Sequence, residues 1–160
     1  LTVPLALAWP GENNRPVKIV PIAINTVQHP LPSPKRCLAL GRAVYEALSA
    51  WPGEERIAIF GTGGLSHQLD GERAGFINKD YDRFCLDNLG PNPEALTEHS
   101  ALDIIELAGS QGIEIINWIA ARGALGPVAH EISRNYHIPI SNTAAATLLL
   151  ETGEALSKVA

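Results

Sequence analysis

A histidine at the end of a glycine-rich segment is the first feature of this sequence that could do chemistry. The segment Gly61-Thr62-Gly63-Gly64-Leu65-Ser66-His67 follows directly on the short apolar run 57–60. Glycines at the end of a strand permit positive φ and close backbone approach, and ligands of α/β sheets bind at such places. Imidazole titrates near neutral pH. His67 is therefore a candidate for proton transfer.

The same glycines have two other interpretations. They could form a tight structural turn, or they could cradle a phosphate group. Their spacing matches neither of the glycine patterns of phosphate-binding loops, G-x-x-x-x-G-K-[ST] and G-x-G-x-x-G. Phosphate binding is therefore disfavoured, whereas a structural turn stays open.

Glu114 is the only charged residue in the apolar stretch 112–119. A buried carboxylate costs several kcal/mol unless it is paired or coordinates a metal. Glu114 could thus be a metal ligand. It could equally lie on the solvated face of an amphipathic helix, with Asn117 beside it.

Ser141 and Asn142 form a third candidate, because these short polar side chains precede an apolar run at 144–150. Such residues could bind a polar group of a ligand. From the residues alone, turn or capping roles are the preferred interpretation.

Strand-like and helix-like segments alternate along the chain, and this pattern is typical of an α/β fold. Residues 1–150 are expected to form one domain, followed by a loose tail at 151–160. The predicted strands are 17–24 (an edge strand, because of Pro21), 57–60 and 144–150. The predicted helices are 34–50, capped by Ser33, then 79–88, 102–121 with interruptions at Gly109 and Gly112, and 128–136.

Composition excludes several classes of protein. The 160 residues are 46% hydrophobic, which suits one globular domain, and they carry a net charge of −5. No basic run exceeds Lys35-Arg36, so nucleic acid is excluded as a partner. No apolar run reaches the ~20 residues that cross a bilayer, so no membrane partner is expected.

Two further features concern the origin of the chain. Cys37 and Cys85 lie in apolar segments without C-x-x-C spacing, and we expect reduced, buried thiols in a cytoplasmic protein. The sequence contains no methionine and begins at Leu1. We therefore expect it to be one piece of a longer polypeptide.

Several motifs occur together in one order: GTGGLSHQL at 61–69, RAGFIN at 73–78, GIE at 112–114, RGA at 122–124 and YHIPISNT at 136–143, with TVPL at 2–5 and NTVQ at 25–28. Together they resemble the class III extradiol ring-cleavage dioxygenase family, in particular catalytic chains of the protocatechuate 4,5-dioxygenase and gallate dioxygenase type. The resemblance covers nearly the whole chain and identifies it with the C-terminal half of such a domain.

The resemblance implies a three-layer α/β domain with a central mixed sheet, of which this chain is the C-terminal portion. It also implies extradiol cleavage of a catechol-type aromatic acid, such as protocatechuate or gallate, by Fe(II) and O₂. The iron would be held by two histidines and one carboxylate, an arrangement that leaves open positions for both substrates. By motif, Glu114 is the iron-binding carboxylate and His67 the acid/base, while Ser141 and Asn142 bind the ring carboxylate.

One departure from the family concerns the iron-binding histidines, which lie in the family's N-terminal half. None of the remaining histidines matches them: His29, His99, His130 and His137. The resemblance therefore implies that the N-terminal half, or another chain, supplies the pair. It also implies an oligomer and leaves a small second subunit open. The alternatives are a non-catalytic family member that binds or scaffolds, and an α/β hydrolase or phosphate-binding enzyme.

Overall fold

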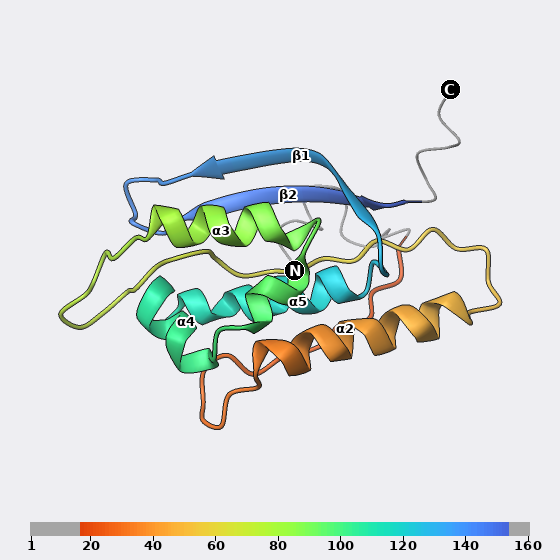
Figure 1. Ribbon diagram of the computed structural model, residues 1–160, viewed down its shortest axis with the longest axis horizontal. Helices are drawn as coiled ribbons and strands as arrows, with labels where there is room; N and C mark the ends of the chain where they lie inside the picture. Colours follow the sequence, from red (N-terminus) through yellow and green to blue (C-terminus); the bar gives the residue numbers. More distant parts are fainter. Residues whose placement is uncertain (1–16, 154–160) are drawn as a thin grey trace.

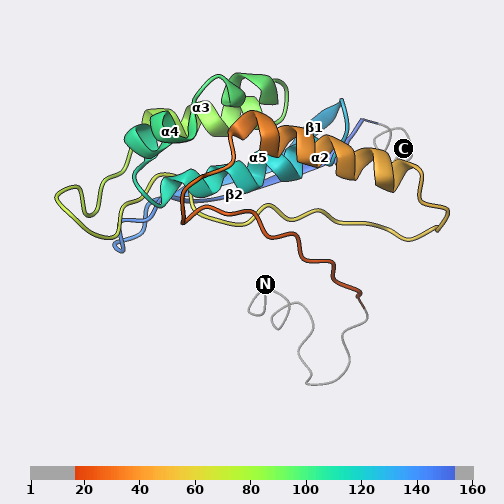
Figure 2. The ribbon, with the colours of Figure 1, turned by 90° about the horizontal axis from the view of Figure 1, so that it is seen from below.

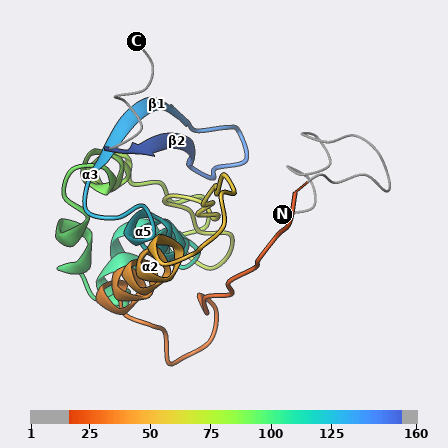
Figure 3. The ribbon, with the colours of Figure 1, turned by 90° about the vertical axis from the view of Figure 1, so that its right-hand side faces the viewer.

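A computed structural model describes residues 17–153 as a helical layer covered by a two-stranded sheet. Figure 1 and Figure 3 show the sheet above α3 and α5, with α2 on the far side of α5. The elements are α2 (Pro34–Ser49), α3 (Lys79–Leu89), η1 (Pro93–Thr97), α4 (Ala101–Ala108), η2 (Gly112–Glu114), α5 (Ile115–Gly123), β1 (Ala129–His137) and β2 (Ala145–Thr152). The α/β class predicted from the sequence is confirmed.

Helices α2, α3 and α4 begin where side-chain caps replace the missing backbone acceptors. Ser33 accepts a hydrogen bond from the Arg36 amide at 3.2 Å, and Asn78 caps α3 in the same way. Ser100 and Asp103 form a reciprocal capping box at the start of α4. The predicted helices at 34–50 and 79–88 are confirmed, and so is the interruption of the segment 102–121.

The core lies between α2, α3, α4 and α5. Its largest fully buried apolar side chains are Leu65, Leu86, Leu89, Leu96, Ile104, Ile113, Ile115, Ile116 and Ile119. Cys37 and Cys85 are free thiols inside this core, as predicted. Burial raises the pKa of the Cys85 thiol to about 12, which keeps it protonated at neutral pH.

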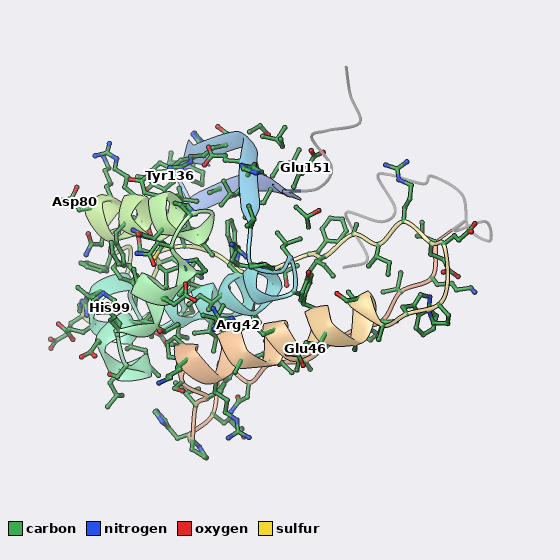
Figure 4. The ribbon with its side chains drawn as sticks, turned by 45° about the vertical axis from the view of Figure 1, so that its right-hand side comes forward. Arg42, Glu46, Asp80, His99, Tyr136 and Glu151 are labelled. Carbon is green, nitrogen blue, oxygen red and sulfur yellow. The ribbon has the colours of Figure 1, made fainter. Side chains whose placement is uncertain are left out.

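Arg122, from the RGA motif, is a structural residue of this core. Its buried guanidinium donates to the carbonyl oxygens of Gly90, Gly126 and Pro127, at distances of 2.7 to 3.3 Å. Burial lowers its pKa. Because carbonyl groups at helix ends lack intrahelical donors, Arg122 satisfies the C-cap carbonyl of α3, and it also holds the turn that follows α5. Nearby, Arg42 of α2, labelled in Figure 4, pairs with Glu94 of η1.

The structure corrects the prediction of a helix at 128–136, because this segment is β1. The apolar residues Val128, Ile132 and Tyr136 recur every four positions. That interval fits one face of a helix, but it is also an even number, so it fits one face of a regular strand as well. In β1 the pairing shifts between Glu131 and Ser133. Pairing with β2, in the register His137↔Ala145 to Ala129↔Thr152, decides for the strand.

The predicted strands at 17–24 and 57–60 are also wrong for the part of the chain that the structure describes. Neither segment forms a helix or a strand, and neither pairs with a strand. A strand requires a neighbour for its backbone groups, and here β1 and β2 pair only with each other. Figure 2 and Figure 3 show residues 17–30 leading away from the helices. Apolar side chains stay exposed on both segments, 84% for Val20 and 74% for Phe60.

The predicted strand at 144–150 is confirmed as β2, which runs on to Thr152 and thus into the expected tail. The rest of that tail, from residue 154, lies outside the described residues, as does the motif at 2–5. Among the helices of residues 17–153, none has the length and apolar character needed to span a bilayer.

Two glycines allow α2 and α5 to cross in direct backbone contact. A Cβ added at Gly41 would lie 2.0 Å from the Ala120 carbonyl oxygen and 2.8 Å from the Gly123 Cα. Neither neighbour can move without moving its helix. The crossing therefore tolerates no side chain at Gly41.

We expect Gly41→Ala to lower the free energy of unfolding by about 2 kcal/mol or more, as overpacking does. Helix propensity alone would give a gain of about 1 kcal/mol, so a net loss isolates the steric effect. The control is Gly90→Ala, whose added Cβ would meet only Leu150 Cδ2, at 3.7 Å. Chemical denaturation of both variants is the measurement, and equal stability of the two would contradict the predicted contact.

Candidate active site

The glycine-rich loop at 61–67 is held from one side by the first turn of α5. The amide of Gly64 donates to Glu114 Oε2 at 2.8 Å. The Asn117 side chain donates to the Thr62 carbonyl at 3.1 Å, and the Trp118 side chain donates to the Gly63 carbonyl at 3.3 Å. Three consecutive backbone groups of the loop are therefore bound by three side chains of one helical turn.

The glycines of this loop allow Glu114 and His67 to approach the same backbone. Gly63 has a φ of +126°, and a Cβ there would lie 2.7 Å from Glu114 Cβ. A Cβ at Gly64 would lie 2.7 Å from His67 Cε1. Gly64 thus contacts the carboxylate through its amide and the imidazole ring through its Cα side. The structure brings these two predicted residues together although they are far apart in sequence.

His67 is buried, with 6% of its surface exposed, and it is fixed by two hydrogen bonds. Its amide donates to the Ala108 carbonyl at the end of α4, at 2.8 Å. Its ring Nδ1 lies 2.9 Å from the Leu65 carbonyl oxygen. A carbonyl oxygen can only accept, so this bond requires the proton on Nδ1. In the neutral ring, Nε2 then carries the lone pair that can take a proton.

Ser141 and Asn142 lie on the connection that brings the chain back to the loop. Just beyond them, the Ala144 amide donates to the Ser66 carbonyl, and the Leu65 amide donates to the Ala144 carbonyl, both at 3.1 Å. Ser141 and Asn142 themselves are exposed. Asn142 has a φ of 54°, and its amide donates to Pro139 O at 3.0 Å. The turn that the residue types indicated is therefore present, and both side chains remain accessible.

Sequence reasoning missed Asp82, a buried carboxylate of α3. Its Oδ1 accepts from the Ser66 amide, and its Oδ2 accepts from the Ser66 hydroxyl and from the Tyr136 hydroxyl, each at 2.7 Å. Figure 4 shows Tyr136 on the part of β1 that lies beside α3. Burial, and then the bond to this carboxylate, raise the pKa of the Tyr136 hydroxyl.

A signal for Asp82 does exist in the sequence. It lies three and four residues before Cys85 and Leu86, on the core-facing stripe of α3. A carboxylate on such a stripe must be hydrogen-bonded, which marks it as part of a buried polar network.

Two other features bear on ligand binding. A shallow pocket of about 370 Å³ lies at the N-terminal ends of α2 and α4, away from the glycine loop, and is lined by His29, Pro30, Leu31, Ser33, Ser100, Ala101 and Leu102. Within residues 17–153, no three His, Cys, Asp or Glu side chains gather as a metal site would require. Among these residues, Glu114 is therefore not part of a group of three side chains that could bind a metal ion.

Comparison with known proteins decides the family. Residues 1–146 match the family described as the catalytic LigB subunit of aromatic ring-opening dioxygenase. This chain belongs to the LigB family. The resemblance seen in the motifs is thereby confirmed.

Three relatives of this LigB chain are dioxygenases by name. Gallate dioxygenase of Pseudomonas putida is 39% identical over 148 residues, which are 92% of this chain and 43% of that protein. The 2,3-dihydroxyphenylpropionate/2,3-dihydroxicinnamic acid 1,2-dioxygenase of Photorhabdus laumondii is 30% identical over 68% of this chain and 33% of that protein. An enzyme of the same name from Dechloromonas aromatica is 34% identical over 48% of this chain and 24% of that protein. The chain spans less than half the length of these relatives.

The geometry of the loop also weakens the phosphate-binding alternative for this LigB chain. An anion cradle needs free backbone amides. Here the Gly64 amide already binds the Glu114 carboxylate, and the Ser66 amide binds Asp82. Two carboxylates facing the loop would repel a phosphate.

Gly109 places His67 against α4, and its replacement should displace the loop. Its φ is +89°, and a Cβ there would lie 2.4 Å from the His67 carbonyl oxygen. We expect Gly109→Ala to cost about 2 kcal/mol or more of stability and to shift the amide resonance of His67.

The matched control is Gly71→Ala. Gly71 also has a positive φ, +74°, but its added Cβ would meet only Gln68 Nε2, at 3.6 Å. It should cost only the backbone strain of about 1 kcal/mol. Unfolding measurements and amide spectra compare the two variants, and equal effects would show that strain, rather than contact with His67, governs Gly109.

Proposed function

We propose that the protein containing this chain is an extradiol dioxygenase, which opens the ring of a catechol-type aromatic acid with Fe(II) and O₂. The observation that carries the proposal is the position of Gly64 between the Glu114 carboxylate and the His67 imidazole, in a chain of the LigB family. A metal-binding group and a proton-transfer group lie on either side of one backbone residue. Ring opening of a catechol needs both.

In this proposal His67 is the acid/base. The bond from Nδ1 to the Leu65 carbonyl leaves Nε2 as the basic nitrogen of the neutral ring. Nε2 would take a proton from a catechol hydroxyl and return it during ring opening. Burial of His67 supports this role, because a fixed ring in a site with little water transfers protons along one path.

Glu114 would be the iron-binding carboxylate. Oε2 is oriented by the Gly64 amide, as is usual for carboxylates that bind metals. Residues 17–153 supply this one donor and no complete metal site, so two histidines must come from the N-terminal half of the protein or from another chain. Bound Fe(II) supplies adjacent positions for the catechol and O₂.

The exposed apolar segments support such a partner. The segments 17–24 and 57–60 present side chains such as Val20 and Phe60 to solvent, and neither is paired. Exposed apolar segments with unpaired backbone groups can pair with a strand of a further chain segment. The relatives are more than twice as long, which fits a missing half that completes the sheet. We further propose that the full protein is a cytoplasmic oligomer.

Ser141 and Asn142 would bind the carboxylate of the ring. Their side chains are exposed beside the residues that pair with the His67 loop. A hydroxyl and an amide can donate to a carboxylate and thereby orient the ring. The relatives' substrates, by name, are gallate and dihydroxyphenylpropionate, and both carry a carboxylate.

The roles of His67 and Glu114 can be separated by measuring iron content beside turnover. In the full protein, His67→Phe should cut turnover roughly 10²–10⁴-fold, the usual contribution of a positioned acid/base, and should leave the iron in place. Glu114→Gln is the matched comparison, because loss of one protein ligand should lower iron occupancy itself.

Two results would contradict these roles. Loss of iron from His67→Phe in proportion to activity would make His67 a ligand, and near-normal turnover would make it neither ligand nor base. If the iron-loaded wild-type protein turned over no catechol at all, a non-catalytic member that binds or scaffolds would be the better description.

Substrate selection tests Ser141 and Asn142. We expect Ser141→Ala and Asn142→Ala each to lower kcat/KM for protocatechuate or gallate by about 10-fold, the loss of one hydrogen bond to a charged group, with little change for plain catechol. Competition between the acid and catechol is the measurement. An unchanged preference in both variants would remove them from the binding site.

A further inference from the structure

One peptide group joins the buried carboxylate of Asp82 to the imidazole of His67. The Leu65–Ser66 peptide donates its N–H to Asp82 Oδ1 at 2.7 Å. The carbonyl oxygen of the same peptide lies 2.9 Å from His67 Nδ1. The order is therefore carboxylate, peptide N–H, peptide carbonyl, and imidazole Nδ1.

The protons in this chain can all be assigned from their partners. Ser66 Oγ accepts from the Asn78 amide at 2.9 Å, so its own proton goes to Asp82 Oδ2. Tyr136 donates to the same oxygen. Because Asp82 receives three donors, it acts purely as an acceptor, as an ionised carboxylate does.

A carboxylate that accepts from a peptide N–H makes the carbonyl oxygen of that peptide a better acceptor, because hydrogen bonds in a chain polarise one another. The improved carbonyl then holds the proton on Nδ1 and stabilises the ring when it becomes positively charged. In hydrolase triads a carboxylate performs this task by direct contact with Nδ1. Here the peptide group would transmit it.

The carboxylate of Asp82 has no cationic partner among the described residues. Asp82 is 1% exposed, and no lysine or arginine among residues 17–153 forms a salt bridge with it. A buried charge is costly unless hydrogen bonds compensate it. Here the compensation comes from the two hydroxyl donors and from the N–H of the peptide that binds His67.

We propose that Asp82 is a positioning residue that fixes the tautomer and orientation of His67 through the Leu65–Ser66 peptide group. Its effect on turnover rests on the proposed ring-cleavage function, whereas its effect on the tautomer does not. The two can therefore fail separately.

The decisive variant is Asp82→Asn, which keeps the shape of the side chain and removes its charge. In the full wild-type protein, ¹⁵N NMR of His67 in the alkaline range should show the proton on Nδ1. Asp82→Asn should weaken the bond from Nδ1 to the Leu65 carbonyl, so that the ring leaves this bond in part of the molecules and a mixture of tautomers is seen. It should also lower kcat roughly 10- to 100-fold, as loss of an orienting partner does, with KM and iron content within about 2-fold.

The matched control is Tyr81→Phe, one residue away in α3. The Tyr81 hydroxyl is buried, and it is not among the described hydrogen-bond partners of Asp82 or Ser66. Its loss should change neither the tautomer nor kcat. A tautomer change in both variants would mean that any alteration of α3 disturbs His67, and would overturn the proposal.

A second variant covers the case in which Asp82→Asn does not fold. Replacing the Ser66 amide by a backbone ester deletes the N–H that faces Asp82 and also weakens the Leu65 carbonyl as an acceptor, so the same loss of the Nδ1 tautomer is expected. The proton on Nε2 in the wild type, or an unchanged tautomer in the folded variants, would overturn the proposal. If the tautomer changes in the variants but the wild type cleaves no ring, the proposed role of Asp82 stands and the proposed ring-cleavage function is wrong.

Discussion

The buried hydrogen bonds between Asp82 and Ser66 are the constraint on which the candidate site depends. A glycine-rich loop has few side chains of its own, so its backbone groups must be satisfied by neighbouring elements. Asp82 accepts a hydrogen bond from the Ser66 amide at the end of the loop, and Glu114 accepts one from the Gly64 amide near its middle. Because both acceptors lie on helices, the positions of α3 and α5 set the position of His67.

Close backbone contact serves the fold and the site in the same way. Gly41 lets α2 cross α5, and Gly109 lets the His67 carbonyl lie against the end of α4. Overlaps of this size involve backbone atoms, which cannot turn aside as a flexible side chain can. The helix that α2 supports is α5, and Glu114 is the N-cap residue of α5. Stability at the α2–α5 crossing and geometry at the loop are thus properties of one packing arrangement.

Helices α2 and α3 were predictable because their signals are local, and β2 was predictable from its apolar run, whereas β1 was not because its assignment depends on a distant partner. Ser33 and Ser100 mark helix starts within a few residues. The segment 128–136 has a spacing that both periods fit, and only β2 decides between them. At the site, His67 and Glu114 could be found from motif and composition. Asp82 could not be assigned a role, since its partners Ser66 and Tyr136 come from segments 16 and 54 residues away.

The contacts that hold the loop are separate from the exposed apolar segments 17–24 and 57–60. The hydrogen bonds that position His67 come from Leu65, Ala108 and the Asp82–Ser66 pair, all within the described core. None of them uses the exposed segments 17–24 and 57–60. A partner that covers those segments would therefore add donors beside Glu114 without having to reshape the loop. Under the proposed function, the acid/base would therefore be built in advance, and assembly would complete only the metal site.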